Sequence, residues 1–324
     1  MTIALDLLTV GRISVDLFSE QINTPFSQPQ TFQKSIGGSP TNVAVAAAKL
    51  GRKSAIVTKV GVDPLGEFVV NKLKSFGVDT SFVKVAESGL TPVVLASQDP
   101  PEDPKIIFHR QPSAPDTQLI VSDIDDQTLK SVKNFWVSAC ALSQGTTAES
   151  IFHWLEVRGR AKETIIDLDY RPSFWKSREE AQVAAQRALS QCTIAIGNIV
   201  ECDVALGITD PKKAADDLLS RGISLAIVKM GGDGVLLATK DKSLVIKPLP
   251  IKLVCGLGSG DAFGGALIHG LLNGWDLEKI GAFANAAGAY LASELMCADA
   301  MPTLEILNKF IEQTLKFDLK LFIP

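Results

Sequence analysis

Residues 254–265 read Val254-Cys-Gly-Leu-Gly-Ser-Gly-Asp-Ala-Phe-Gly-Gly265, a glycine-rich run whose single acid is Asp261. A strand-like stretch, Leu244–Leu253, precedes the run, and an apolar stretch that predicts a helix to about Leu272 follows it. Small residues at a helix start let backbone N–H groups approach an anion closely, and the helix dipole favours negative charge there. Asp261 would stand beside that anion in the first helical turn. The arrangement favours phosphoryl transfer, with amides for the transferring group and a carboxylate to deprotonate a hydroxyl.

The same run has two other interpretations. It is compatible with a plain glycine-rich turn in which Asp261 only stabilises the helix dipole. A nicotinamide site is disfavoured because no βαβ unit with a ribose-binding acid follows the run, and Asp261 would repel a pyrophosphate. The chain contains no Gly-x-x-x-x-Gly-Lys-Ser/Thr motif, which excludes a Walker-type ATPase.

Outward from this run, buried apolar strands alternate with helices along the chain. The expected strands are Leu7–Val10, Ala55–Val60, Phe135–Ala139, Thr164–Asp169, Thr193–Gly197 and Ser224–Lys229. The expected helices are Pro40–Leu50 with Ser39 as N-cap, Leu65–Phe76, Thr147–Arg158, Ser177–Ser190 and Lys212–Ser220. Strands that are apolar on both faces, with helices between them, predict an α/β fold with a mostly parallel sheet covered on both sides.

Two segments rich in Pro, Gln, Ser and Thr interrupt this alternation, residues 13–36 and residues 92–117. The second contains two short strand-like pieces, Pro92–Ser97 and Lys105–Arg110. We expect these segments to leave the main sheet and to pair with each other as a small β lid. Because no linker or internal repeat is visible, we predict one domain over residues 1–324 that carries this lid.

The bulk composition excludes several classes of protein. The 324 residues are 46% hydrophobic with a net charge of -4, so a large core is possible and nucleic acid is not expected as a partner. The five cysteines are scattered and only three histidines are present, which argues against a Cys/His metal site and suits a reducing compartment. No stretch has the composition of a membrane span, and the N-terminus has an early acid and no basic region. We therefore expect a cytoplasmic protein.

A second run, Gly37-Gly-Ser-Pro-Thr-Asn42, precedes an alanine-rich helix and taken alone would be a tight turn with a helix cap. In order and spacing, this run and Gly258-Ser-Gly-Asp-Ala-Phe263 resemble the two signatures of the ribokinase-like (PfkB) carbohydrate kinases. The resemblance covers essentially the whole chain. It implies a ribokinase-like fold, ATP as phosphate donor with Mg²⁺, a small carbohydrate as acceptor and a homodimer.

The resemblance also implies a role for particular residues. Asp261 would be the catalytic base, beside an anion hole for the γ-phosphate formed by Gly258, Ser259 and Gly260. The sugar would be contacted by Asp16, Gly37, Gly38 and Asn42. The nucleotide would lie near Asn198, Glu201, Lys229, Gly231, Gly234 and Asn285, with Glu201 reaching Mg²⁺ through water.

Some of these residues have structural explanations as well. Glu201 is also explained as a first-turn acid of a helix, and Asn285 as a satisfied polar residue between packed helices. Lys229 is also explained as a charge at the end of a strand.

Two arginines narrow the expected substrate. Asp167-Leu-Asp-Tyr-Arg171-Pro-Ser-Phe-Trp175 resembles a segment of family members that act on keto-deoxy sugar acids, and Arg110 follows a strand of the expected lid. A guanidinium is the natural partner of a carboxylate, although Arg171 could instead pair with an internal acid such as Asp169. The resemblance implies transfer to the primary hydroxyl of 5-dehydro-2-deoxy-D-gluconate, an intermediate of inositol catabolism. The alternatives are a kinase for 2-keto-3-deoxygluconate, fructose or a nucleoside, and a binding protein that lacks catalysis.

The chain departs from the family pattern at Cys255-Gly256-Leu257, where an Asp-Thr-Thr sequence is usual. In ribokinase-type members that Asp helps to hold a monovalent cation, so the sequence does not predict K⁺ activation. Cys255 would be oxidation-sensitive if exposed and inert if buried.

Overall fold

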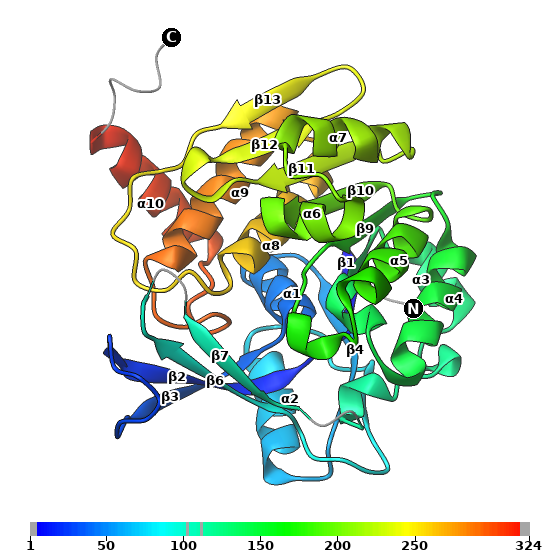
Figure 1. Ribbon diagram of the computed structural model, residues 1–324, viewed down its shortest axis with the longest axis vertical. Coiled ribbons are helices and arrows are strands. Elements are labelled where there is room, and N and C mark those ends of the chain that lie inside the picture. The colour runs from blue at the N-terminus through cyan, green and yellow to red at the C-terminus, as the bar shows by residue number, and fades with distance from the viewer. Residues whose placement is uncertain (1–4, 102–103, 111–112, 318–324) are drawn as a thin grey trace.

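The computed structural model describes residues 5–101, 104–110 and 113–317. Its main sheet has the strand order β13-β12-β11-β10-β9-β8-β1-β4-β5 (Figure 1). The strands are β1 (Leu7–Val10), β4 (Ser54–Val60), β5 (Val83–Val85), β8 (Asn134–Ser138), β9 (Glu163–Asp167), β10 (Ile194–Asn198), β11 (Leu225–Lys229), β12 (Val235–Ala238) and β13 (Ser243–Ile246). Neighbouring strands from β5 to β11 are parallel, and β12 and β13 extend one edge as antiparallel strands.

Helices cover both faces of this sheet because successive strand residues are buried on opposite sides. Leu7 belongs to the apolar cluster of one face and Leu8 to that of the other, and Ile227 and Val228 divide in the same way. One face carries α1 (Ser39–Lys49), α2 (Pro64–Ser75), α8 (Ser259–Leu272), α9 (Leu277–Ala292) and α10 (Leu304–Phe317). The other carries α3 (Asp126–Ser131), α4 (Gly145–Arg158), α5 (Arg178–Leu189), α6 (Ile199–Leu206) and α7 (Pro211–Ser220). The predicted fold class is confirmed.

Two local predictions were wrong. Ser39 is the first residue of α1 rather than its N-cap, which is Gly38, and the Ser39 hydroxyl instead donates to Asp167 across the molecule. The strand expected over Leu244–Leu253 ends at Ile246, because β13 is an edge strand that pairs only with the four residues of β12. The chain then continues without regular structure to the start of α8.

The two polar segments form a separate small sheet with the order β3-β2-β6-β7. Its strands are β2 (Ser14–Ile22), β3 (Phe32–Gly37), β6 (Val93–Gln98) and β7 (Lys105–His109). Figure 1 shows this sheet at one side of the main body. Positions 102–103 and 111–112 of the second expected lid segment lie outside the described residues.

The glycine-rich start of α8 is held close to α1 by packing. A side chain on Gly265 would lie 2.4 Å from the Ala46 side chain, and one on Gly264 would lie 2.7 Å from the ring of Trp136. Only glycine therefore allows α8 to approach α1 so closely. This contact brings the two signature runs together although they are more than two hundred residues apart in the chain. Of the helices described, none combines the length and apolar character needed to cross a membrane.

Candidate active site

Three polar residues end three adjacent parallel strands. Asp167 is the last residue of β9, Asn198 of β10 and Lys229 of β11, and the register places Asn198 beside Lys229. Ligand sites of open α/β sheets form at this carboxyl edge. The strands thus deliver an acid, an amide and an ammonium group to one place.

The N-terminus of α8 faces the same edge. Gly258 has φ 78°, and a side chain there would lie 2.7 Å from the sulfur of Cys297, so this turn requires glycine. The Asp261 N–H donates to the Gly258 carbonyl at 2.9 Å, whereas the N–H groups before it at the helix start have no acceptor within the helix. The Lys229 ammonium lies beside them, 2.8 Å from the position that a Cβ on Gly260 would occupy. Together they form a positive site suited to a phosphate group.

Asp261 lies in the first turn of α8 and touches both signature runs. Its Oδ2 accepts a hydrogen bond of 2.8 Å from the side-chain amide of Asn42, in α1. Burial raises the pKa of Asp261 to about 6, while the hydrogen bond from Asn42 works against the rise. A carboxylate with this pKa is ionised at neutral pH and still basic enough to accept a proton from a hydroxyl.

The charges around Asp261 are strongly coupled. Burial raises the pKa of Asp167 to about 8, Lys229 opposes the rise, and the neighbouring carboxylates add to it. Burial alone would lower the pKa of Lys229, but the surrounding carboxylates, Glu201 first, raise it. Lys229 therefore stays charged while Asp167 is largely protonated at neutral pH.

The Asn-x-x-Glu element forms a capping box at the start of α6. The Asn198 side chain accepts from the Glu201 N–H at 2.9 Å, and Glu201 Oε2 accepts from the Asn198 N–H at 2.6 Å. This arrangement agrees with the structural explanation of Glu201 as an acid in the first turn of a helix. Both residues nevertheless line the cavity at the strand ends, so the cap also aims the carboxylate at that space.

Two connected cavities meet at Asp261. The first, of about 360 Å³, contains the strand-end residues and the start of α8. The second lies under the small sheet, and its lining includes Asp16, Gly38 and Asn42. Four residues line both: Ser39, Ile106, Arg171 and Asp261, together with the turn Leu257–Gly258.

The predicted sugar-binding residues are brought together in the second cavity. Ser14 Oγ donates to Asp16 Oδ1 at 2.6 Å, and a Cβ on Gly37 would overlap the other oxygen of the Asp16 carboxylate. The Asn42 Oδ1 atom is buried without a hydrogen-bond partner in the described part of the chain. A buried amide oxygen in this state is an acceptor available to a ligand hydroxyl.

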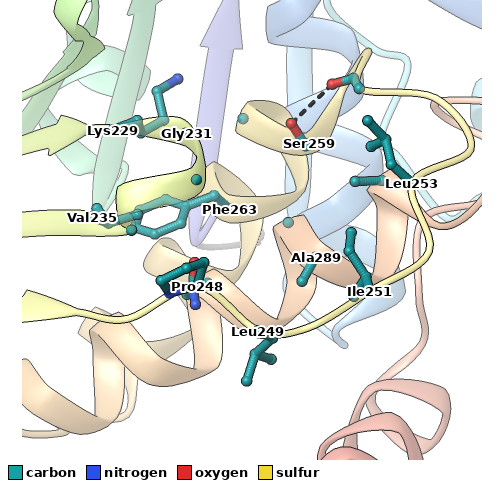
Figure 2. Close-up of a pocket in the computed structure, with 17 residues that line it drawn as sticks. Lys229, Gly231, Val235, Pro248, Leu249, Ile251, Leu253, Ser259, Phe263 and Ala289 are labelled. Atoms are coloured by element: carbon teal, nitrogen blue, oxygen red, sulfur yellow. Dashed lines mark hydrogen bonds between the residues drawn. The ribbon is translucent and has the colours of Figure 1, made fainter. Parts of the chain in front are cut away.

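A third cavity, of about 490 Å³, adjoins the start of α8 and is mainly apolar (Figure 2). Figure 2 shows Lys229 and Ser259 at one end and Val235, Pro248, Leu249 and Phe263 along the walls. Gly231 and Gly234 line it, and Gly231 has open space where a side chain would be. The amide of Asn285 faces it and donates to the Lys247 carbonyl at 2.9 Å.

The two arginines expected to bind substrate have different surroundings. Arg171 lines both cavities that meet at Asp261. Its Nε lies 3.2 Å from Asp169 Oδ1, so the internal ion pair named as an alternative in the sequence analysis is present. Arg110 lies outside these cavities, where its buried guanidinium pairs with Asp116. That internal pairing is a structural alternative to the predicted contact between Arg110 and the substrate, which stays a prediction.

Sequence reasoning missed two functional candidates. Arg12 lines the sugar-side cavity, and Asp167 lines the strand-end cavity. The signal for Asp167 was available, since an acid at the carboxyl end of a buried strand marks the carboxyl edge of a parallel sheet. Arg12 follows strand β1 in the same way, four residues before Asp16.

The described residues contain no group of three or more His, Cys, Asp or Glu side chains that could hold a metal ion. Cys255 is buried, and burial raises the pKa of its thiol. Of the two alternatives, an exposed thiol sensitive to oxidation and a buried inert thiol, the structure therefore shows the second.

Comparison with known proteins decides which family has this geometry. Residues 4–304 match the pfkB family of carbohydrate kinases. The chain belongs to that family. A curated relative from Clostridium beijerinckii named 5-dehydro-2-deoxygluconokinase is 35% identical over 320 residues, covering 95% of this chain and 93% of the relative. One of the same name from Geobacillus thermodenitrificans is 33% identical over 315 residues, with 95% and 93% covered.

Solved structures agree on the fold. A fructokinase with bound ATP from Xylella fastidiosa superimposes with a TM-score of 0.83 at 21% identity, covering 95% of this chain and 98% of that one. Aminoimidazole riboside kinase from Salmonella enterica gives 0.78 at 24% identity, covering 94% and 99%. The predicted family, its ribokinase-like fold and its ATP-dependent carbohydrate kinase activity are therefore confirmed.

Proposed function

We propose that this pfkB kinase transfers the γ-phosphate of ATP to the primary hydroxyl of 5-dehydro-2-deoxy-D-gluconate. The relatives from Clostridium and Geobacillus that carry this activity in their name match along nearly the whole chain. The observation that carries the proposal is the position of Asp261 where two cavities meet, because a base there reaches an acceptor on one side and a phosphate on the other.

The proposed proton transfer follows from the pKa of Asp261. Its ionised carboxylate accepts the proton of the primary hydroxyl as the hydroxyl oxygen attacks the γ-phosphorus, and the bond to the β–γ bridging oxygen breaks. The first-turn amides of Gly258, Ser259 and Gly260 and the ammonium of Lys229 stabilise charge on the transferring group. Arg171, which lines both cavities, adds a further positive charge near the point of transfer.

The nucleotide fits the third cavity. Its apolar walls suit a purine, the open space at Gly231 lets a ligand approach the backbone, and Asn285 offers an amide. Gly234 ends the turn that begins at Gly231 and packs against the backbone of β13, since a side chain on Gly234 would overlap the Ile246 carbonyl.

A magnesium ion fits the strand-end cavity although the described residues offer no full ligand set. Mg²⁺ usually keeps several waters and binds through one or two carboxylates plus substrate phosphates. Glu201 lines that cavity and would hold the ion through water. When bound with ATP, the ion supplies positive charge to the phosphates.

The sugar would lie in the cavity under the small sheet. Asp16 and Asn42 offer acceptors to its hydroxyls, and Gly37 and Gly38 leave the space for them. The small sheet covers this cavity, so its closure as a lid would exclude water and limit hydrolysis of ATP.

We also propose a homodimer formed through the outer face of the small sheet. The register aligns Leu17 with Leu95 and Leu95 with Ile107 across three strands. Ile107 is 42% exposed and the other two are half-buried. A second copy of the chain would cover this apolar row.

The function is tested by coupled ADP release from purified protein with ATP, Mg²⁺ and a panel of acceptors. The panel contains 5-dehydro-2-deoxygluconate, 2-keto-3-deoxygluconate, fructose and a nucleoside. We expect the highest kcat/KM with 5-dehydro-2-deoxygluconate and no acceptor-dependent turnover in the D261N variant. Preference for fructose or a nucleoside would overturn the substrate, and turnover by D261N at the wild-type rate would overturn the base.

A further inference from the structure

Arg12 is a buried cation on the wall of the sugar-side cavity. It follows β1, its side chain is 9% exposed, and it lines this cavity with Asp16, Asn42 and Asp261. Its backbone is fixed, because the Arg12 carbonyl accepts from Thr41 Oγ1 at 3.0 Å. This hydrogen bond ties the backbone at position 12 to the helix that carries Asn42.

The guanidinium of Arg12 lacks a fixed polar partner. Its buried Nε has no hydrogen-bond partner, and no carboxylate forms an ion pair with it within 4.0 Å, among the residues that the structure describes. Its charge does act on Asp16, whose pKa burial raises and Arg12 lowers. A buried cation without direct hydrogen bonds is costly, so such a group in a cavity wall points to a ligand that completes it.

Two aromatic rings orient this cation. The Arg12 guanidinium lies 5.2 Å from the ring centre of Phe108 and 5.7 Å from that of Phe174. Aromatic rings stabilise the charge of a guanidinium without accepting ordinary hydrogen bonds from it, so its edge of N–H donors stays free. The free edge is the part that binds a carboxylate through two parallel hydrogen bonds.

The other arginines near the site differ in this respect. Arg110 is paired with Asp116 and lines neither cavity, although its guanidinium lies 4.9 Å from the ring centre of Phe174, and Arg171 is paired with Asp169. Arg171 lines both cavities, whereas Arg12 lines only the sugar-side cavity, which excludes the strand-end residues around Lys229. A substrate whose hydroxyl lies at Asp261 would thus extend its other end toward Arg12.

We infer that Arg12 binds the carboxylate of the sugar acid and so selects acids over neutral sugars. The inference rests on the proposed function, since it requires an acidic substrate. The primary hydroxyl and the carboxylate are the two ends of a six-carbon chain, and the cavity presents a base for one end and an unpaired guanidinium for the other.

The test is calorimetric binding of D-gluconate and of D-glucitol, its neutral counterpart, to the full-length protein. We expect the wild-type protein to bind D-gluconate at least tenfold more tightly than D-glucitol. Arg12→Met should weaken D-gluconate binding about 30-fold, because hydrogen bonds to charged groups contribute about 1.5–3 kcal/mol, and leave the affinity for D-glucitol within threefold. Arg187→Met is the matched control, because its guanidinium also lies over an aromatic ring, Phe152, but lines neither cavity; this variant should keep the preference for the acid.

Equal losses for D-gluconate and D-glucitol in Arg12→Met would assign Arg12 a structural role and overturn the inference. An acid-specific loss of the same size in Arg187→Met would do the same. Where Arg12→Met does not fold, Arg12→Lys decides, because it keeps the charge without the planar fork: at least a threefold drop in the preference supports the inference, and an unchanged preference overturns it. A wild-type protein that shows no preference for D-gluconate over D-glucitol overturns both the inference and the proposal of an acidic substrate. This result differs from a preference that persists in the Arg12 variants, which overturns the inference alone.

Discussion

Asp261 is held in a charged state that its surroundings oppose. Burial raises its pKa to about 6, so at neutral pH the folded protein carries an ionised carboxylate that would be more stable in water. An unfolded aspartate titrates near its ordinary value, 3.8. The stabilisation associated with this raised pKa is present below that value and is lost as the pH rises through about 6.

Replacement of Asp261 by Asn should therefore separate activity from stability. We expect kcat to fall by at least about a thousandfold, since general-base catalysis and orientation of the nucleophile are both lost, while ATP still binds. The melting temperature at pH 7.5 should rise, because the amide needs no ionisation. This gain should shrink as the pH falls from 6 towards 4. The measurement is a thermal melt of the variant and of wild type at each pH. A variant that melts at a lower temperature than wild type at pH 7.5 would show that the buried ionised carboxylate does not destabilise the folded protein.

Asn42 should set the pH dependence of the reaction. Its hydrogen bond to Asp261 stabilises the ionised carboxylate and lowers its pKa, so Asn42→Ala should raise the pKa of the base further. In wild type we expect kcat/KM to fall below about pH 6, and in the variant this acidic limb should move to higher pH. Asn285→Ala is the control, expected to raise the KM for ATP without moving the limb. A variant limb that coincides with that of wild type would rule out this role for Asn42.

At the scale of elements, Gly37 joins β3 to α1 where β2 carries Asp16. A Cβ at position 37 would overlap the Asp16 carboxylate, so Gly37→Ala should displace the small sheet at its base. We expect a weaker sugar affinity and a loss of about 1–3 kcal/mol in the free energy of unfolding, as in overpacked cores. The measurement is urea unfolding of Gly37→Ala in the wild-type and Asp16→Ala backgrounds. The loss should largely disappear with Asp16→Ala, and a loss of equal size in both would place the strain elsewhere.

Six strands of the main sheet (β1, β4, β8, β9, β10 and β11) were predictable from sequence because each is a short apolar run, and several helices have local start or stop signals. The Asn198–Glu201 capping box and the helix after Gly258 are of this kind. Contacts between distant segments were not predictable in this way. Only the fold shows that Arg110 has an internal partner in Asp116 and that the buried Nε of Arg12 has no hydrogen-bond partner among the described residues.

At the scale of the whole molecule, the proposed base belongs to the main body, and the small sheet would cover a sugar bound in the sugar-side cavity. Asp16 and Phe108 line the sugar-side cavity from β2 and β7, whereas Asp261 comes from α8. Neither part forms this cavity alone. The position of the small sheet therefore controls whether a bound sugar is sheltered from water, and a partner that fixes this sheet would affect catalysis as well as assembly.

A homodimer through the outer face of the small sheet leads to the last prediction. A charge placed in the row of Leu17, Leu95 and Ile107 would have to be desolvated on both copies, which opposes association. We expect wild type to have the mass of a dimer by light scattering and Ile107→Glu that of a monomer, with a raised KM for the sugar because the sheet is no longer fixed. Val245→Glu, on the exposed edge strand β13, is the matched control and should remain a dimer. A wild-type monomer would refute the dimer itself. A dimer that survives Ile107→Glu would place the interface on another face, because a buried glutamate pair cannot be accommodated in an apolar row without a compensating charge.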